Sequence, residues 1–355
     1  MEISSLGEFG LIRRLTSDIV PKNAETVKGV GDDCAVVAPA AGRRLLVTTD
    51  MLMEGVHFDL EYTPLQHLGY KSAMVNLSDI YAMNGRPRQM TVSLAVSKRF
   101  SVEDLELFYS GLRMACEKHE CDIVGGDTTS SLTGLAISIT CIGDAEADDV
   151  VYRSGAQVND LICCSGDLGA AYMGLQLLER EKTVYHKLLA NARARGESPD
   201  SLPPFEPDFS GREYLLERQL RPEARRDIVE ALHAAGIRPT AMMDISDGLS
   251  SELLHICSQS GVGCRVYEDR IPLDYQTAVM AEELNFNVMT CALNGGEDYE
   301  LLFTVPLTEH DRVSAIPGVK VIGHCTRSEL GTLFVGRDGA EMTLKAQGWN
   351  PLANS

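Results

Sequence analysis

Apolar residues recur along the chain with two different periods, one typical of strands and one typical of helices. Short apolar segments predict four strands in the first half of the chain, over residues 44–49, 90–96, 135–142 and 160–164. Residues 102–119 place apolar side chains at helical spacing, so we expect a helix there. Residues 70–83 are expected to form a second, mostly apolar helix that carries the polar pair Ser78 and Asp79. Strands that alternate with helices predict an α/β or α+β fold rather than a helix bundle or a β-sandwich.

The second half of the chain continues this alternation. Its pattern predicts helices over residues 222–235 and 249–258, and strands over residues 240–244 and 301–305. The polar segment 143–149 follows a strand and contains little to bury, so we predict a domain boundary there. Residues 1–149 and 150–355 would then form two domains, which agrees with the length of 355 residues.

One stretch of the second domain does not follow the pattern. Residues 180–215 are interpreted as an insertion, and its centre, residues 196–211, is rich in Pro, Ser and acidic side chains. Such a composition is typical of an exposed loop. From the sequence alone, we interpret the insertion as a surface feature without a catalytic role.

The charge and composition exclude several classes of protein. Fifty-one acidic residues against 32 basic ones give a net charge of −19, which argues against nucleic-acid binding because a phosphate backbone requires a basic surface. No run of about 18 apolar residues predicts a membrane helix, and the first 15 residues lack the layout of a signal peptide. We therefore expect a cytoplasmic protein. Its ten cysteines show no CxxC or paired Cys/His spacing and are expected to be reduced and buried rather than bonded to each other or to zinc.

Acidic residues gather beside Gly, Ser or Thr in six short segments that we place at the ends of elements. These segments are residues 29–33, 48–50, 76–79, 125–129, 244–248 and 295–300. Any one of them is explained by a turn or a helix cap. In the segment DISDG, we expect Asp244 to end a strand while Ser246 and Asp247 open a helix. Six such segments together favour Mg²⁺, which prefers oxygen ligands and usually retains water and substrate phosphates in its shell.

Several common catalytic motifs are absent from the sequence. It contains no GxxxxGK[ST] loop and no HRD or DFG set, which excludes the machinery of P-loop NTPases and protein kinases. The GxG of GVGDD lacks the third glycine of a dinucleotide fingerprint, and neither HExxH nor GxSxG is present. The carboxylate segments are therefore the main candidate for chemistry.

In their order and spacing, these segments resemble the thiamine-monophosphate kinase family of the aminoimidazole ribonucleotide synthetase superfamily. The most specific parts of the resemblance are TTDMLMEGVHF, NLSDIYAMNGRP, RSGA, DISDGLSSEL and NGGEDYELLFTVP. The resemblance extends from residue 7 to residue 349 and leaves the insertion unmatched. Thr48 stands where the family often has Ser, which also offers a hydroxyl. Asn159 stands where Gly is common, and Asn tolerates a left-handed turn.

The resemblance implies an ATP-dependent phosphotransferase that converts thiamine monophosphate into thiamine diphosphate with the help of several Mg²⁺ ions. The metal ligands that it implies are Asp33, Thr48, Thr49, Asp50, Asp79, Asp127, Asp244 and Asp247. The implied ATP contacts are Tyr109, Gly126, Asp127, Arg153 and Ser246. The implied contacts to thiamine monophosphate are His57, Glu297 and Trp349. Asp244, Asp247 and Arg153 would be the catalytic residues.

The resemblance also implies a fold and an assembly. It predicts an N-terminal α/β domain whose sheet pairs with that of a second subunit, a larger C-terminal α/β domain, and a cleft between the domains that holds the active site. Two alternatives stay open on the sequence: another ATP-dependent synthetase of the same superfamily, and a nucleotide-sensing protein without turnover. Selenophosphate synthetase is disfavoured because no Cys precedes Cys34.

Overall fold

The computed structural model describes residues 14–28, 36–198 and 204–347, and within these ranges the chain forms two large sheets and one small one. The first large sheet has the order β3-β6-β4-β5. Its strands are β3 (Arg43–Met53), β6 (Leu135–Glu146), β4 (Arg86–Val96) and β5 (Asp122–Ser130). The α/β class predicted from the sequence is confirmed, and the strands predicted over residues 44–49, 90–96 and 135–142 are present with longer bounds.

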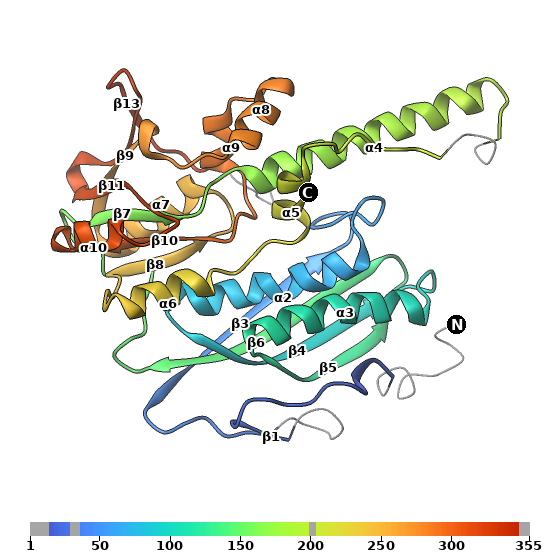
Figure 1. Cartoon of the computed structure of the whole chain (residues 1–355), viewed down its shortest axis with the longest axis horizontal. Helices are drawn as coiled ribbons and strands as arrows, with labels where there is room; N and C mark the ends of the chain where they lie inside the picture. Colours follow the sequence, from blue (N-terminus) through green and yellow to red (C-terminus); the bar gives the residue numbers. More distant parts are fainter. Residues whose placement is uncertain (1–13, 29–35, 199–203, 348–355) are drawn as a thin grey trace.

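Two helices, α2 (Leu65–Ala82) and α3 (Val102–His119), cover one face of this sheet (Figure 1). They approach closely because Gly69 and Gly111 have no side chains: a Cβ on Gly69 would lie 1.9 Å from the carbonyl oxygen of Phe108. Helix α3 begins at a capping box, in which the Ser101 side chain and the Asp104 side chain each accept a hydrogen bond from the other residue's backbone N–H. The opposite face of the sheet has no covering helix among the described elements (Figure 1).

The second large sheet has seven strands in the order β13-β12-β9-β11-β7-β10-β8. Their bounds are β13 (Glu341–Thr343), β12 (Thr332–Val335), β9 (Val262–Tyr267), β11 (Val319–Arg327), β7 (Leu161–Ser165), β10 (Glu300–Val305) and β8 (Ala241–Ile245). The helices of this half are α4 (Ala170–Ala194), α5 (Glu213–Leu220), α6 (Arg226–Ala234), α7 (Leu249–Ser260), α8 (Tyr275–Glu283), α9 (Val288–Asn294) and α10 (His310–Ser314). The small sheet pairs β1 (Thr26–Lys28) with β2 (Val36–Val37).

One hydrophobic core extends through both large sheets. The cluster includes Leu77 of α2, Ile139 of β6, Leu232 of α6 and Phe303 of β10, all fully buried. Helices α2 and α6 lie between the two sheets (Figure 1). The division into domains at residue 149 therefore stays a prediction, and the apolar interior is continuous across it.

Some predicted elements differ from the structure. Residues 143–146 were expected to be a boundary with little to bury, but they continue β6 and pair with β3 as far as Arg43 and Glu146. The reason is that Asp144 is buried and forms ion pairs with Arg43 and Arg88. These ion pairs compensate for the burial of its charge, so the strand can continue through a polar segment. Segment 125–129 lies within β5 rather than in a loop, and segment 48–50 lies in the middle of β3.

The insertion is also more regular than expected. Helix α4 continues to Ala194, well into the predicted insertion, and extends beyond the sheets (Figure 1). The described residues between 196 and 211 form no helix or strand, which agrees with the predicted loop there. The predicted helix over 222–235 begins only at Arg226.

Two expectations from composition can be compared with the described residues. All nine cysteines among them are free and buried, as expected for reduced thiols. No helix in the described ranges is both long enough and apolar enough to cross a membrane.

Candidate active site

Three elements bring acidic side chains together between the two sheets. Strand β3 supplies Thr48 and Asp50, the C-terminal part of α2 supplies Ser78 and Asp79, and the end of β8 supplies Asp244. The Thr48 hydroxyl donates a hydrogen bond to the Asp79 carboxylate. Ser78 Oγ donates to Asp244 Oδ2 over 2.6 Å. Residues that lie 166 positions apart in the sequence therefore share one polar site.

The carboxylates of this site repel one another in the absence of a cation. Burial and the nearby charge of Asp79 raise the pKa of Asp50 from 3.8 to about 6. Burial, then Asp79 and Asp50, raise the pKa of Asp244 to about 7. Burial also raises the pKa of Asp79, although the Thr48 hydroxyl and the charge of Arg153 oppose the shift. A bound cation would reduce this repulsion between the carboxylates.

The donor set fits Mg²⁺. Asp50 Oδ2 is buried and has no hydrogen-bond partner among the described residues, so an oxygen ligand is available at the centre of the site. In the described ranges, no three Asp, Glu, His or Cys side chains are close enough together to hold a metal ion by themselves. Mg²⁺ commonly takes only one or two carboxylates from the protein and completes its shell with water and substrate phosphates. An open set of this kind is therefore what a nucleotide-bound Mg²⁺ would require.

The turn after β8 and the start of α7 add two more acidic residues, Asp247 and Glu252, next to this cluster. The backbone N–H of Asp247 donates to Glu252 Oε1 over 2.9 Å, which fixes the turn between β8 and α7. Gly248 has φ 111°, and a Cβ there would lie 2.8 Å from Asn294 Cα, so the turn requires glycine. Ser246 and Asp247 lie in this turn, whereas the sequence predicted that they open the helix, which begins at Leu249.

Arg153 is a positively charged residue of this site. Burial raises the pKa values of Asp79, Asp244 and Asp247. The charge of Arg153 opposes this rise at each of the three carboxylates but is too weak to cancel it. The guanidinium therefore lies within electrostatic reach of these three carboxylates.

A second polar group surrounds Glu297, in the loop before β10. Lys71 Nζ of α2 donates to Glu297 Oε2 over 2.9 Å, and Gln219 Nε2 of α5 donates to the same oxygen over 2.9 Å. Lys71 Nζ also donates to the backbone oxygen of Gln219. Glu297 has φ 66°, and its N–H donates to the Ser246 carbonyl over 2.8 Å. This backbone bond places the predicted substrate residue directly beside the Ser246–Asp247 turn.

His57 belongs to the same neighbourhood. Its Nδ1 accepts a hydrogen bond from the Met53 N–H over 3.0 Å. Burial lowers the pKa of His57, while the charge of Glu297 raises it and that of Lys71 lowers it. The three side chains are thus within electrostatic reach of one another, although they come from three different parts of the chain.

Four residues of the site were not singled out as site residues from the sequence. Ser78 and Glu252 hold the acidic cluster, and Lys71 and Gln219 hold Glu297. Of these four, only Lys71 could have been recognised from the sequence, because it is a lysine within an apolar helical segment. In the structure it is only 3 % exposed. A buried lysine requires an acidic partner.

Other residues predicted to belong to the site lie away from the acidic cluster in the folded chain. Gly126 and Asp127 lie on β5, at the opposite edge of the sheet from β3. Tyr109 is buried in α3 against Phe108. Thr49 alternates with Thr48 and Asp50 along β3, so it lies on the other face of the sheet, where its hydroxyl donates to the Ile139 carbonyl. Asp33 and Trp349 lie outside the described residues.

Comparisons with known proteins agree with this arrangement. Residues 31–145 match the family model described as AIR synthase related protein, N-terminal domain. The thiamine-monophosphate kinase of Aquifex aeolicus is 37% identical over 332 residues, which cover 91% of this chain and 96% of the relative. The chain belongs to the thiamine-monophosphate kinase family. The enzyme of Bacillus subtilis is 30% identical and is matched over 99% of its length.

Solved structures of the family share the fold. Thiamine-monophosphate kinase from Stenotrophomonas maltophilia K279a superposes with a TM-score of 0.73 at 30% identity, over 93% of this chain and 95% of that one. AaThiL complexed with AMPPCP and TMP gives a TM-score of 0.71 at 31% identity, over 98% of each chain. The hydrogenase maturation protein HypE in complex with ATP gives 0.72 at 18% identity and shows the fold alone. Family membership confirms the predicted resemblance and disfavours the alternative of another synthetase.

The raised pKa values predict how the stability of the metal-free protein depends on pH. Between pH 3.8 and about 7, the folded protein retains protons on Asp50 and Asp244 that the unfolded chain has lost. Raising the pH through this range therefore favours the unfolded state. We expect the melting temperature of the metal-free protein to fall between about pH 4 and pH 7, and Mg²⁺ to reduce that fall. Calorimetry in the presence of a chelator measures it, and a rise in stability over this range would contradict the prediction.

Proposed function

We propose that the site between the two sheets transfers the γ-phosphoryl group of ATP to thiamine monophosphate, which yields thiamine diphosphate and ADP. The observation that carries the proposal is the contact between two groups of residues. The acidic cluster of Asp50, Asp79 and Asp244 lies beside the Glu297 group, and the bond from the Glu297 N–H to the Ser246 carbonyl joins them. Donor and acceptor could therefore be held in adjacent parts of one site.

Each group has a separate role in this proposal. Asp50, Asp79, Asp244 and Asp247 would hold Mg²⁺, which supplies charge neutralisation between the phosphates. Arg153 would bind the triphosphate by charge-assisted hydrogen bonds, and Ser246 would contact the nucleotide. These groups offset the repulsion between two anionic substrates, which is the main electrostatic obstacle to the reaction.

Acceptor activation requires no general base. The attacking atom is an oxygen of the phosphate of thiamine monophosphate, and this phosphate is largely ionised near pH 7 because its second pKa is about 6. The protein therefore has to align the acceptor in line with the γ-phosphorus and exclude competing water. Glu297 and His57 would bind the organic part of thiamine monophosphate and provide this alignment.

The direct test is an assay for the product. The purified protein is mixed with Mg²⁺, ATP and thiamine monophosphate, and thiamine diphosphate and ADP are quantified by chromatography. Formation of equal amounts of both products supports the proposal, and a chelator should abolish it. Release of ADP and free phosphate without thiamine diphosphate would refute the kinase assignment.

We also propose a homodimer formed through the first sheet. Along β3, four of the side chains that face away from α2 are apolar and exposed, with Thr49 between them: Leu45, Val47, Met51 and Met53. Val47 is 66% and Met51 60% exposed. An apolar strip on an edge strand is a typical protein interface and a liability in a monomer.

Charge on this strip should dissociate the dimer. Val47→Glu is expected to shift the protein towards a monomer, because a carboxylate in an apolar interface loses its hydration without gaining a partner. Sedimentation velocity measures the change, and Leu307→Glu, at an exposed apolar residue of the second half of the chain, is the matched control. If Val47→Glu sediments like the unmodified protein, the strip is not the interface.

A further inference from the structure

We propose that helix α4, which extends into the insertion, is a brace that sets the relative positions of the two loops that bind thiamine monophosphate. This inference rests on the proposed function and deepens it. Loop 54–63 carries His57, and loop 295–299 carries Glu297. Residues at two levels of α4 hold these loops, one near its N-terminus and one about halfway along it.

The middle of α4 contacts loop 54–63 through one stripe of side chains. Tyr62 Oη donates to Glu179 Oε1 over 2.7 Å, Lys182 forms an ion pair with Asp59, and His186 Nε2 lies 2.8 Å from Glu61 Oε2. The helix residues are three and four positions apart, so they lie on the same face of α4. Three consecutive turns of the helix therefore face the loop.

Further contacts tighten this attachment. Lys182 Nζ lies 5.8 Å from the centre of the Tyr62 ring, which allows a cation–π interaction. The Lys182 ion pair lowers the pKa of Asp59, and Asp59 raises the pKa of Lys182. Asp59 also organises its own loop, because its Oδ1 accepts from the Glu61 N–H over 2.8 Å. Asp59 is only two positions from His57, so its place constrains that of His57.

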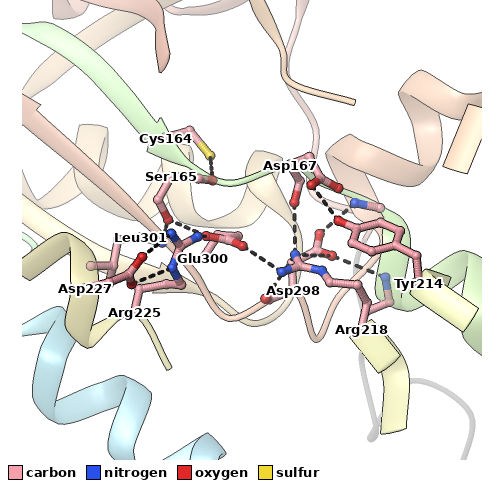
Figure 2. Close-up of polar contacts among 12 residues, drawn as sticks. Cys164, Ser165, Asp167, Tyr214, Arg218, Arg225, Asp227, Asp298, Glu300 and Leu301 are labelled. Atoms are coloured by element: carbon pink, nitrogen blue, oxygen red, sulfur yellow. Dashed lines mark hydrogen bonds and ion pairs between the residues drawn. The ribbon is translucent and has the colours of Figure 1, made fainter. Parts of the chain in front are cut away.

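The N-terminal end of α4 holds the other loop. The Asp298 carboxylate accepts hydrogen bonds from the N–H groups of Gly169 and Ala171, over 2.8 and 3.4 Å. Asp298 is 1% exposed and also pairs with Arg218 of α5. Figure 2 shows Asp298 beside Arg218. Since Asp298 follows Glu297 directly, the start of α4 fixes the backbone of the Glu297 loop.

One rigid helix thus connects both loops. From Ala170 to Lys182 the helix is about 18 Å long at about 1.5 Å per residue, and this length does not change with ligand binding. A single exposed ion pair contributes little, but several pairs on one helical stripe restrict the same loop. The brace should therefore affect the binding of thiamine monophosphate and leave the binding of ATP unchanged.

The test is a charge reversal on the stripe. Lys182→Glu would face Asp59 with a like charge, and we expect the KM for thiamine monophosphate to rise about fivefold to tenfold, with kcat and the KM for ATP nearly unchanged. The double variant Lys182→Glu with Asp59→Lys should restore the lower KM. Lys187→Glu on the same helix is the matched control, because Lys187 is exposed and forms no ion pair with any described residue.

The outcomes separate the brace from the proposed function. If the unmodified protein makes thiamine diphosphate and Lys182→Glu leaves its KM unchanged, the brace is refuted while the kinase assignment stands. Equal effects on both substrates, or an equal effect of Lys187→Glu, would also refute it. Should Lys182→Glu fold poorly, Tyr62→Phe removes only one hydroxyl and should raise the same KM by a smaller factor. An unchanged KM in that variant would overturn the inference.

Discussion

Replacement of Asp244 by Asn is expected to lower kcat by at least about 10²-fold, because a metal-binding carboxylate contributes several kcal/mol to the transition state of phosphoryl transfer. Asp244 is buried near the end of β8, and the charges of Asp79 and Asp50 act on it. The amide keeps the shape of the side chain and can still accept the hydrogen bond from Ser78. Steady-state kinetics with excess Mg²⁺ measure the loss.

The same substitution should not weaken the fold. It removes a carboxyl group whose pKa is raised to about 7 by burial and neighbouring acids, so the metal-free variant should melt at the same temperature as the unmodified protein or above it. The stabilisation by Mg²⁺ should disappear. Asp269→Asn, at an exposed position, is the control. A fully active Asp244→Asn enzyme that still responds to Mg²⁺ would refute the metal role.

Replacement of Arg218 by Met is expected to destabilise the protein by about 3–5 kcal/mol, since removal of one partner leaves buried carboxylates without compensation. Arg218 Nη1 lies 2.7 Å from Glu300 Oε1, and Arg225 pairs with the other oxygen of Glu300 (Figure 2). Ser165 Oγ donates to Glu300 over 2.5 Å. Because Glu300 and Asp298 are each 1% exposed, water cannot replace the lost guanidinium. Urea denaturation measures the free energy of unfolding.

A more exposed ion pair next to the same helix provides the control for Arg218. Arg212, just before α5, pairs with the partly exposed Glu283, and Arg212→Met should cost less than about 1 kcal/mol. Equal losses for the two variants would mean that burial does not determine the contribution of this network. A loss below about 1 kcal/mol for Arg218→Met would contradict the prediction.

The sequence predicted the acidic residues of the site better than the residues that support them. Asp50, Asp79 and Asp244 are recognisable because each stands in a Gly-, Ser- or Thr-containing motif, and the structure brings them together. Lys71, Gln219 and Arg218 stand in no such motif. Their partners Glu297 and Asp298 are 78 to 226 positions away, and only the packing of α2 and α5 against the second sheet brings them together.

The errors in secondary structure have a common physical cause. Segments 48–50 and 125–129 are polar, so the sequence placed them at strand ends, whereas both lie within strands. Thr49 lies on the uncovered face of the sheet, which tolerates polar side chains, whereas Thr48 faces α2 and donates a hydrogen bond to Asp79. Segment 143–146 was misplaced for a related reason, because two arginines compensate for the buried Asp144. Local polarity could not reveal partners that arrive from another strand.

The hydrogen bonds of α2 have a consequence for how the protein unfolds. Helix α2 covers the first sheet, while its Lys71 and Ser78 donate hydrogen bonds to Glu297 and Asp244 of the second half of the chain. Separation of the halves would break these bonds and expose the shared core. We therefore expect a single cooperative transition, and amide hydrogens in β6 and β8 should exchange with the same free energy of opening. The hydrogen bonds that hold the proposed binding residues Glu297 and Asp244 would then also join the two sheets into one folding unit.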